Sequence, residues 1–219
     1  MNTSATPEVK NARLKARALE LLPMLSSEDQ RKFRRKFESE SAHQAAHSAR
    51  ELFLGIFLRK NGFVVKYEIP VMARTPDWAI LNDDSSIQAI VEQLTFHQVP
   101  GLDKEMNIAI LSGQEWVDWM PDNTPRLYQK LHEKADRYAS IADAAGVAYL
   151  IAVFADFFAA VDREQLDEAL FKAYGGGVYA DRPSLSGVIF CQESNGRYAF
   201  EYIPNPSASR PLLVVGCQV

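Results

Sequence analysis

Two acidic residues accompany apolar runs in the segment TPDWAILNDDSSIQAIVEQLTF, residues 75–96. Asp77 stands at the start of one run and Glu92 near the end of the next. Along a strand, side chains alternate between faces, so Glu92 shares its face with Ile90 and Leu94. An ionised group there is costly unless it is paired, hydrogen-bonded or bound to a metal. Mg²⁺ commonly takes one or two carboxylates together with water and phosphate oxygens. Asp77 and Glu92 are therefore candidate metal ligands; the alternative is a turn start and a solvent-facing strand Glu.

The two acids must be positioned by neighbouring strands. The β-branched and aromatic stretches 63–71, 76–81 and 87–96 predict three strands, and the turn cluster NDDSS predicts a hairpin between the last two. Pro70 indicates that the first strand ends there or lies at an edge of the sheet. The hairpin can bring the carboxylates of Asp77 and Glu92 close together.

Helical spacing of apolar residues predicts helices on both sides of these strands. The predicted helices are a short one over 7–22, a long segment from Ser26 or Ser27 to Lys60 with a bend or break near 39–41, and helices over 126–146 and 163–177. The stretch 99–125 predicts a loop with a short helix. The glycines at 175–177 predict the end of the helix that begins at 163, and the residues after 177 predict a loop.

Further strands complete the expected sheet. A nearly continuous apolar run over 147–155 predicts a strand buried on both faces, and 186–192 with 197–203 predict a second hairpin. The order helix, three strands, helix, strand, helix, hairpin predicts an α/β sandwich with a central mixed sheet flanked by helices. We expect one domain over 26–219, preceded by an N-terminal helical extension over 1–25.

Composition places the 219-residue chain in the globular class, with 47% apolar and 24% charged residues. No apolar stretch reaches the roughly 20 residues of a membrane helix, and the N-terminus has no signal-like apolar run. We therefore expect a cytoplasmic protein without a membrane span. The two cysteines have no metal-binding spacing.

Charge is unevenly distributed along the chain. The formal net charge is -4, which gives no general attraction to polyanions. Between Lys10 and Lys36, however, lies a basic block. A solvated helix face is the preferred interpretation of this block over a phosphate-binding arm, because a charge run alone is weak evidence.

The segment SARELFLGIFLRKNGFVVKYE, followed by PDW and then by VEQ, resembles the PD-(D/E)xK nuclease superfamily, the restriction-endonuclease-like fold. It is similar to poorly characterised members with Glu-Leu on the first helix, PDF in the second strand and VEAT in the third. The resemblance covers about residues 45–155 and implies metal binding by Asp77 and Glu92, with Mg²⁺ or Mn²⁺ as the ion. A Glu on the first helix can assist in this family, which here implies Glu51.

One position departs from the family pattern. Leu94 stands where the family has a lysine that orients or activates the attacking water, and an apolar side chain cannot stabilise developing negative charge. Some members supply the lysine from a neighbouring helix. Lys130 and Lys134 are the candidates, with Lys134 preferred because EKADRY resembles the Lys-x-x-x-Tyr helix of the family. Gln93 is another substitute, although strand alternation directs it to the opposite face.

These observations lead to two expectations of function. The first is a Mg²⁺-dependent nuclease that hydrolyses phosphodiester bonds of nucleic acid. The alternative is a catalytically inactive nuclease-like domain that binds nucleic acid or a protein partner, so whether the chain is an enzyme stays open. A component recognised by protein partners alone is a third interpretation. DNA versus RNA, sequence preference, homodimer formation and pathway are not determined by these motifs.

Overall fold

A seven-stranded mixed sheet forms the centre of the computed structural model, which describes residues 7–96, 122–155, 161–194, 197–215 and 217–219. Its strands follow one another in chain order: β1 (Val64–Tyr67), β2 (Trp78–Leu81), β3 (Ile87–Phe96), β4 (Ala148–Ala155), β5 (Gly187–Ser194), β6 (Arg197–Pro204) and β7 (Cys217–Gln218). β4 is parallel to both β3 and β5, and every other neighbouring pair is antiparallel. The predicted mixed sheet is confirmed.

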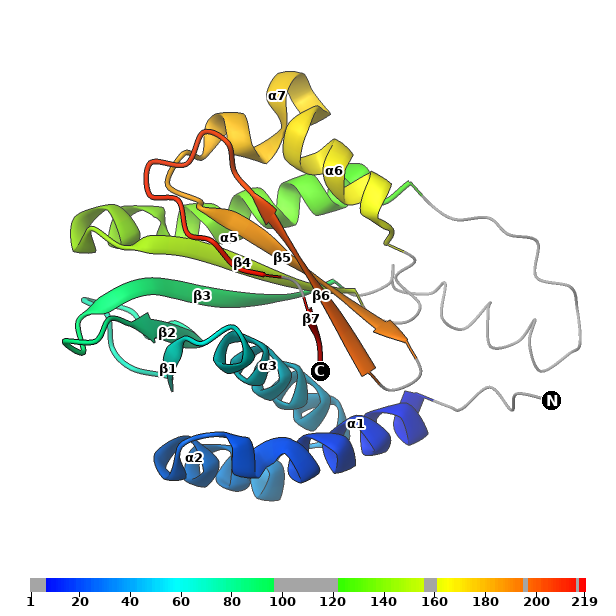
Figure 1. Ribbon diagram of the computed structural model, residues 1–219. Helices are drawn as coiled ribbons and strands as arrows, with labels where there is room; N and C mark the ends of the chain where they lie inside the picture. The colour runs from blue at the N-terminus through cyan, green and yellow to red at the C-terminus, as the bar shows by residue number, and fades with distance from the viewer. Residues whose placement is uncertain (1–6, 97–121, 156–160, 195–196, 216) are drawn as a thin grey trace, which may run out of the picture.

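Helices cover both faces of the sheet (Figure 1). On one face lie α1 (Pro7–Leu21), the short 3-10 helix η1 (Leu22–Met24), α2 (Ser27–Ser39) and α3 (Ala42–Lys60); on the other lie α5 (Thr124–Ala145), α6 (Arg163–Phe171) and α7 (Ala173–Asp181). Each face has its own apolar core, because strand side chains alternate. Val91 of β3 packs toward α3, for example, and Ile90 packs toward α5.

Local capping explains why the long helical segment divides in two. The Ser26 side chain accepts a hydrogen bond from Asp29 N at 3.2 Å and caps α2. Ser41 and Gln44 then form a reciprocal capping box that starts α3. The predicted break near residues 39–41 is thus confirmed. Leu14 and Ala18 of α1 are buried in the same apolar cluster as the α3 residues.

The hairpin of β2 and β3 has the predicted turn. Asn82 N donates to Ser86 O at 2.9 Å, and Trp78 pairs with Val91 at the other end of the ladder. β3 covers Ile87–Phe96, as the sequence predicts. β4 is paired on both edges and buried on both faces over almost its whole length, in agreement with its continuous apolar sequence.

Two predicted elements differ in the structure. The first strand is only Val64–Tyr67, because Glu68 adopts a left-handed backbone with φ of 46°. The helix predicted to stop at the glycines ends earlier, at Phe171, and residues after Gly177 return to helix instead of forming a loop. Gly177 has φ of 69°, and a Cβ there would lie 2.2 Å from Leu170 O, so glycine allows this close re-entry.

The predicted loop over 99–125 lies almost entirely outside the described residues. Among the described helices, none combines the length and the apolar character that a membrane crossing requires.

Candidate active site

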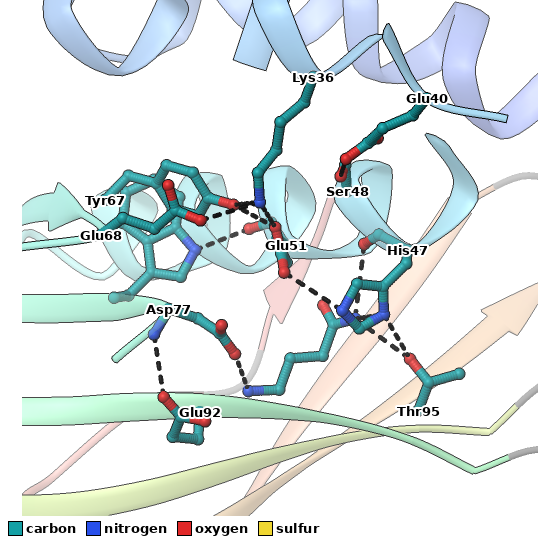
Figure 2. A network of polar contacts seen from close by, with 12 residues as sticks. Lys36, Glu40, His47, Ser48, Glu51, Tyr67, Glu68, Asp77, Glu92 and Thr95 are labelled. Atoms are coloured by element: carbon teal, nitrogen blue, oxygen red, sulfur yellow. Dashed lines mark hydrogen bonds and ion pairs between the residues drawn. The ribbon is translucent and has the colours of Figure 1, made fainter. Parts of the chain in front are cut away.

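The register of the hairpin places Asp77 directly beside Glu92 (Figure 2). Asp77 N donates to Glu92 Oε1 at 3.0 Å, and Gln93 N donates to Asp77 Oδ2 at 2.6 Å. The Glu92 side chain is buried, and Asp77 is half-buried. Both acids are therefore held at fixed positions by backbone hydrogen bonds where the β2–β3 ladder ends.

Lys134 extends from α5 to this pair of acids. Its Nζ lies 2.6 Å from Glu92 Oε2, and only 14% of its side chain is exposed. Tyr149 of β4 donates its hydroxyl to Lys134 O at 2.9 Å, which ties this turn of α5 to the sheet. Lys130, the other lysine considered from the sequence, is exposed and pairs with Glu133 at 3.5 Å. The structure thus brings Lys134 to Glu92 and leaves Lys130 on the surface.

Tyr138 lies one helical turn after Lys134 and borders the same carboxylate. Its hydroxyl donates to Thr75 O at 3.4 Å. Burial, together with the negative charge of Glu92, raises the pKa of Tyr138 above its ordinary value, so its hydroxyl keeps its proton. Both ends of the Lys-x-x-x-Tyr pattern in α5 therefore surround Glu92.

Asp77 carries an unusual pKa for an aspartate. Burial is the main cause that raises it to about 7, and the negative charges of Glu92 and Glu51 add to the effect, while Lys134 opposes it. Lys134 pairs with Glu92, and the carboxylate of Asp77 itself has no ion pair with a lysine among the described residues. Additional positive charge near Asp77 would therefore be stabilising.

Glu51 projects from α3, and both of its carboxylate oxygens have partners from the protein. Oε2 accepts from the Tyr67 hydroxyl and pairs with Lys36 Nζ at 3.1 Å, and Oε1 lies 3.3 Å from His47 Nε2. Burial alone would raise the pKa of Glu51, but His47, Lys36 and Tyr67 together hold it below its ordinary value. Trp78 Nε1 also donates to Glu51 O at 2.8 Å, which fixes the helix over β2.

Gln93 connects the group around Asp77 with the group around Glu51. Its backbone contacts Asp77, while its side chain points to the α3 face, as strand alternation predicts. Gln93 Nε2 lies 2.9 Å from His47 Nδ1 and 3.1 Å from Thr95 Oγ1. Gln93 therefore does not occupy the place of the missing motif lysine. Leu94 packs against the apolar core on the α5 face.

Sequence reasoning did not include Lys36, Tyr67 or His47 among the site residues. The spacing of His47 and Glu51, four residues apart on one helix, was a usable signal for their contact. Lys36 and Tyr67 reach Glu51 from α2 and β1, and no local pattern in the sequence relates those elements.

The donor set at Asp77 and Glu92 suits a hard divalent cation. In the part of the chain that the structure describes, no three His, Cys, Asp or Glu side chains are grouped so as to hold a metal ion. Mg²⁺ does not need such a cage, since one or two carboxylates with water and phosphate suffice. The two strand acids are carboxylates of the kind that Mg²⁺ takes, and both oxygens of Glu92 also contact the protein, at Asp77 N and Lys134 Nζ.

Comparisons with known proteins found no matching family model, no matching curated protein and no matching solved structure. A function for this chain must therefore be argued from the chemistry of its own residues.

Proposed function

We propose that this protein is a Mg²⁺-dependent nuclease related to the PD-(D/E)xK superfamily, with a restriction-endonuclease-like core. In this proposal Asp77 and Glu92 hold the metal ion, and Lys134 takes the role of the lysine that Leu94 replaces. The 2.6 Å ion pair of Lys134 and Glu92 is the observation that carries the proposal. The order of α3, β1 to β3, α5 and β4 also agrees with the sequence resemblance.

The chemistry assigns a separate task to each residue. An ammonium group has three N–H donors, so Lys134 can pair with Glu92 and also donate to a phosphoryl oxygen or to the attacking water. A divalent cation, when bound, supplies charge neutralisation at the phosphate and lowers the pKa of water. Tyr138 and Tyr149 help to hold Glu92 and Lys134 in place.

The assignment of Glu51 follows from its contacts. Glu51 contacts Lys36, Tyr67 and His47, adds negative charge at Asp77 and fixes α3 over the hairpin, so it is proposed to assist the site.

An inactive nucleic-acid-binding domain is the second candidate function. Leu94 at the motif position and the complete pairing of the Glu51 carboxylate by protein groups favour it. This candidate predicts binding of nucleic acid without cleavage.

A cleavage assay separates the two candidates. Single- and double-stranded DNA and RNA are incubated with the protein and Mg²⁺ or Mn²⁺, and product is quantified for wild type, Asp77→Asn and Lys134→Met. The nuclease proposal expects cleavage that falls by roughly 10²- to 10³-fold in both variants. Lys130→Met is the matched control, since Lys130 lies on the same helix but is exposed, and it should cleave like wild type.

Circular dichroism confirms folding of each variant before the rates are compared. Equal cleavage by Asp77→Asn and wild type would exclude the proposed metal site. Absence of cleavage by wild type on every substrate would favour the inactive binder.

A further inference from the structure

Helix α2 contains the densest group of cations in the basic block. The segment RKFRRK, residues 31–36, has five cationic residues in six positions. Helical geometry divides them between two directions, because residues three or four apart share a face. The two lysines and the three arginines consequently have different surroundings.

The two lysines are used within the protein. Lys32 Nζ donates to Tyr67 O at 2.6 Å, and Lys36 Nζ pairs with Glu51 at 3.1 Å and with Glu68 at 2.9 Å. Together they attach α2 to the end of β1. These contacts account for Lys32 and Lys36 but not for the remaining cations of α2.

Arg31, Arg34 and Arg35 point to solvent; we call them the α2 arginine surface. None of the three forms an ion pair with any other residue that the structure describes. Arg31 lies three and four residues before the other two, and like charges at these spacings destabilise a helix. Glu28 and Glu38 stand at helical spacing from these arginines and offset part of this repulsion, but neither forms an ion pair with them in the described structure, so a polyanion on the surface would relieve the remainder.

Helix α2, which carries the arginine surface on its solvent side, packs at the same end of the sheet as Asp77. Lys36 of the same helix contacts Glu51 and Glu68, and Glu68 N donates to Asp77 O at 3.0 Å. Figure 1 shows α2 outside α3, near β1 and β2. The helix that carries the arginines is thus linked through Lys36 and Glu68 to the sheet end that carries Asp77.

From this charge complementarity we infer that the α2 arginine surface binds the phosphate backbone of nucleic acid and guides it to the site. The inference rests on the proposed function, since it assigns the substrate-binding surface of that site. Arginine pairs bidentately with phosphate. Phe33 and Phe37 of α2 are buried in the core, so this helix offers phosphate contacts without aromatic base stacking. Binding by this surface is independent of base sequence.

The test is a binding titration with fluorescein-labelled DNA, single-stranded and duplex, in EDTA so that cleavage cannot occur. Affinity is measured by fluorescence anisotropy between 50 and 200 mM salt for wild type and for the triple variant Arg31→Gln, Arg34→Gln, Arg35→Gln. Each lost phosphate contact reduces the slope of log affinity against log salt by about 0.7 to 0.9. The triple variant should therefore lose about two to three units of slope and at least tenfold in affinity at 100 mM salt, alike for two unrelated base sequences.

A matched control removes the same charge elsewhere. The variant Arg59→Gln, Lys172→Gln, Arg197→Gln alters three exposed cations outside α2 and should retain the wild-type salt slope to within one unit. Equal slopes and affinities for the α2 triple variant and wild type would overturn the inference. Loss of binding to phosphatidylserine vesicles without loss of DNA binding would also overturn it, because the surface would then recognise a membrane. An absence of DNA binding by wild type in EDTA would overturn it as well.

The same experiment keeps this inference distinct from the proposed function. Arginine-dependent DNA binding without cleavage in Mg²⁺ would support the α2 surface and reject the nuclease. Cleavage by wild type, together with unchanged binding and cleavage by the α2 triple variant, would support the nuclease and reject the α2 surface.

Discussion

Lys134 Nζ and Glu92 Oε2 lie 2.6 Å apart and join helix α5 to strand β3. Only 14% of the Lys134 side chain and 3% of the Glu92 side chain are exposed. A carboxylate this deeply buried is costly without a partner, so the pair explains how Glu92 is accommodated on an otherwise apolar strand face. It also places a cation at the candidate site, where Leu94 cannot provide one.

Replacement of Lys134 should reduce stability as well as cleavage. Lys134→Met leaves Glu92 buried without its cation, and we expect the free energy of unfolding to fall by about 3 kcal/mol, measured by urea denaturation. In the double variant Lys134→Met, Glu92→Gln, the loss should be about 2 kcal/mol smaller than the sum of the single losses. Lys130→Met should change stability by less than about 0.5 kcal/mol. If the loss in the double variant equals the sum of the two single losses, the two side chains are not coupled.

The raised pKa of Asp77 predicts a pH-dependent contribution to stability. Because the pKa rises from 3.8 to about 7, the folded protein holds this proton more tightly than the unfolded chain does. The contribution of Asp77 is therefore most favourable below about pH 4 and falls as pH increases to about 7. Asp77→Asn lacks this titration, so without metal it should gain stability relative to wild type over that range, by at most about 4 kcal/mol. Chemical denaturation in EDTA at a series of pH values measures the free energy of unfolding of Asp77→Asn and of wild type. If the two plots of this free energy against pH run parallel, the prediction is contradicted.

Loss of the Glu51 charge should destabilise the fold. Glu51→Gln weakens the contacts with Lys36, His47 and Tyr67, and we expect the free energy of unfolding to decrease by about 3 kcal/mol at pH 7. The folded-state pKa of Glu51 lies below its ordinary value of 4.5. The loss of unfolding free energy in Glu51→Gln relative to wild type should therefore be at its full size above that pH and become smaller at lower pH. Glu38→Gln, on the exposed surface of α2, is the control and should remain within about 0.5 kcal/mol of wild type. A difference that grows on acidification would reject this account of the Glu51 contacts.

Gly55 should not tolerate even a methyl group. Alanine normally stabilises a helix interior relative to glycine by about 1 kcal/mol, but a Cβ at this position would lie 2.1 Å from Trp78 Cζ2. We expect Gly55→Ala to lower the free energy of unfolding by about 2 kcal/mol through overpacking. A smaller ring in Gly55→Ala, Trp78→Phe should relieve part of this loss, so the double variant should be less destabilised than the sum of the singles. A stabilised Gly55→Ala protein would show that Trp78 can move away freely.

Local sequence signals were sufficient for most of the secondary structure. The alternation of 87–96, the NDDSS turn and the continuous apolar run of β4 correspond to strands and a turn in the structure. They succeed because strand period, turn chemistry and burial leave local traces. The end of the first strand and the re-entry after Gly177 were not predicted, because they depend on the backbone of Glu68 and on contact with Leu170.

The sequence by itself predicted a hairpin that can bring Asp77 and Glu92 together, and the structure shows the contact, with Asp77 N donating to Glu92 Oε1. The sequence favoured Lys134 over Lys130 only through the resemblance of EKADRY to a family helix, and the spacing of the two lysines, four residues apart on one helix, does not show which of them reaches the acids. That choice depends on how α5 packs: buried Leu127, Leu131 and Ala135 set the rotation of the helix against the sheet, and Lys134 then reaches Glu92. The pairing of Glu51 with Lys36 and Tyr67 likewise exists only after three separate elements have packed together.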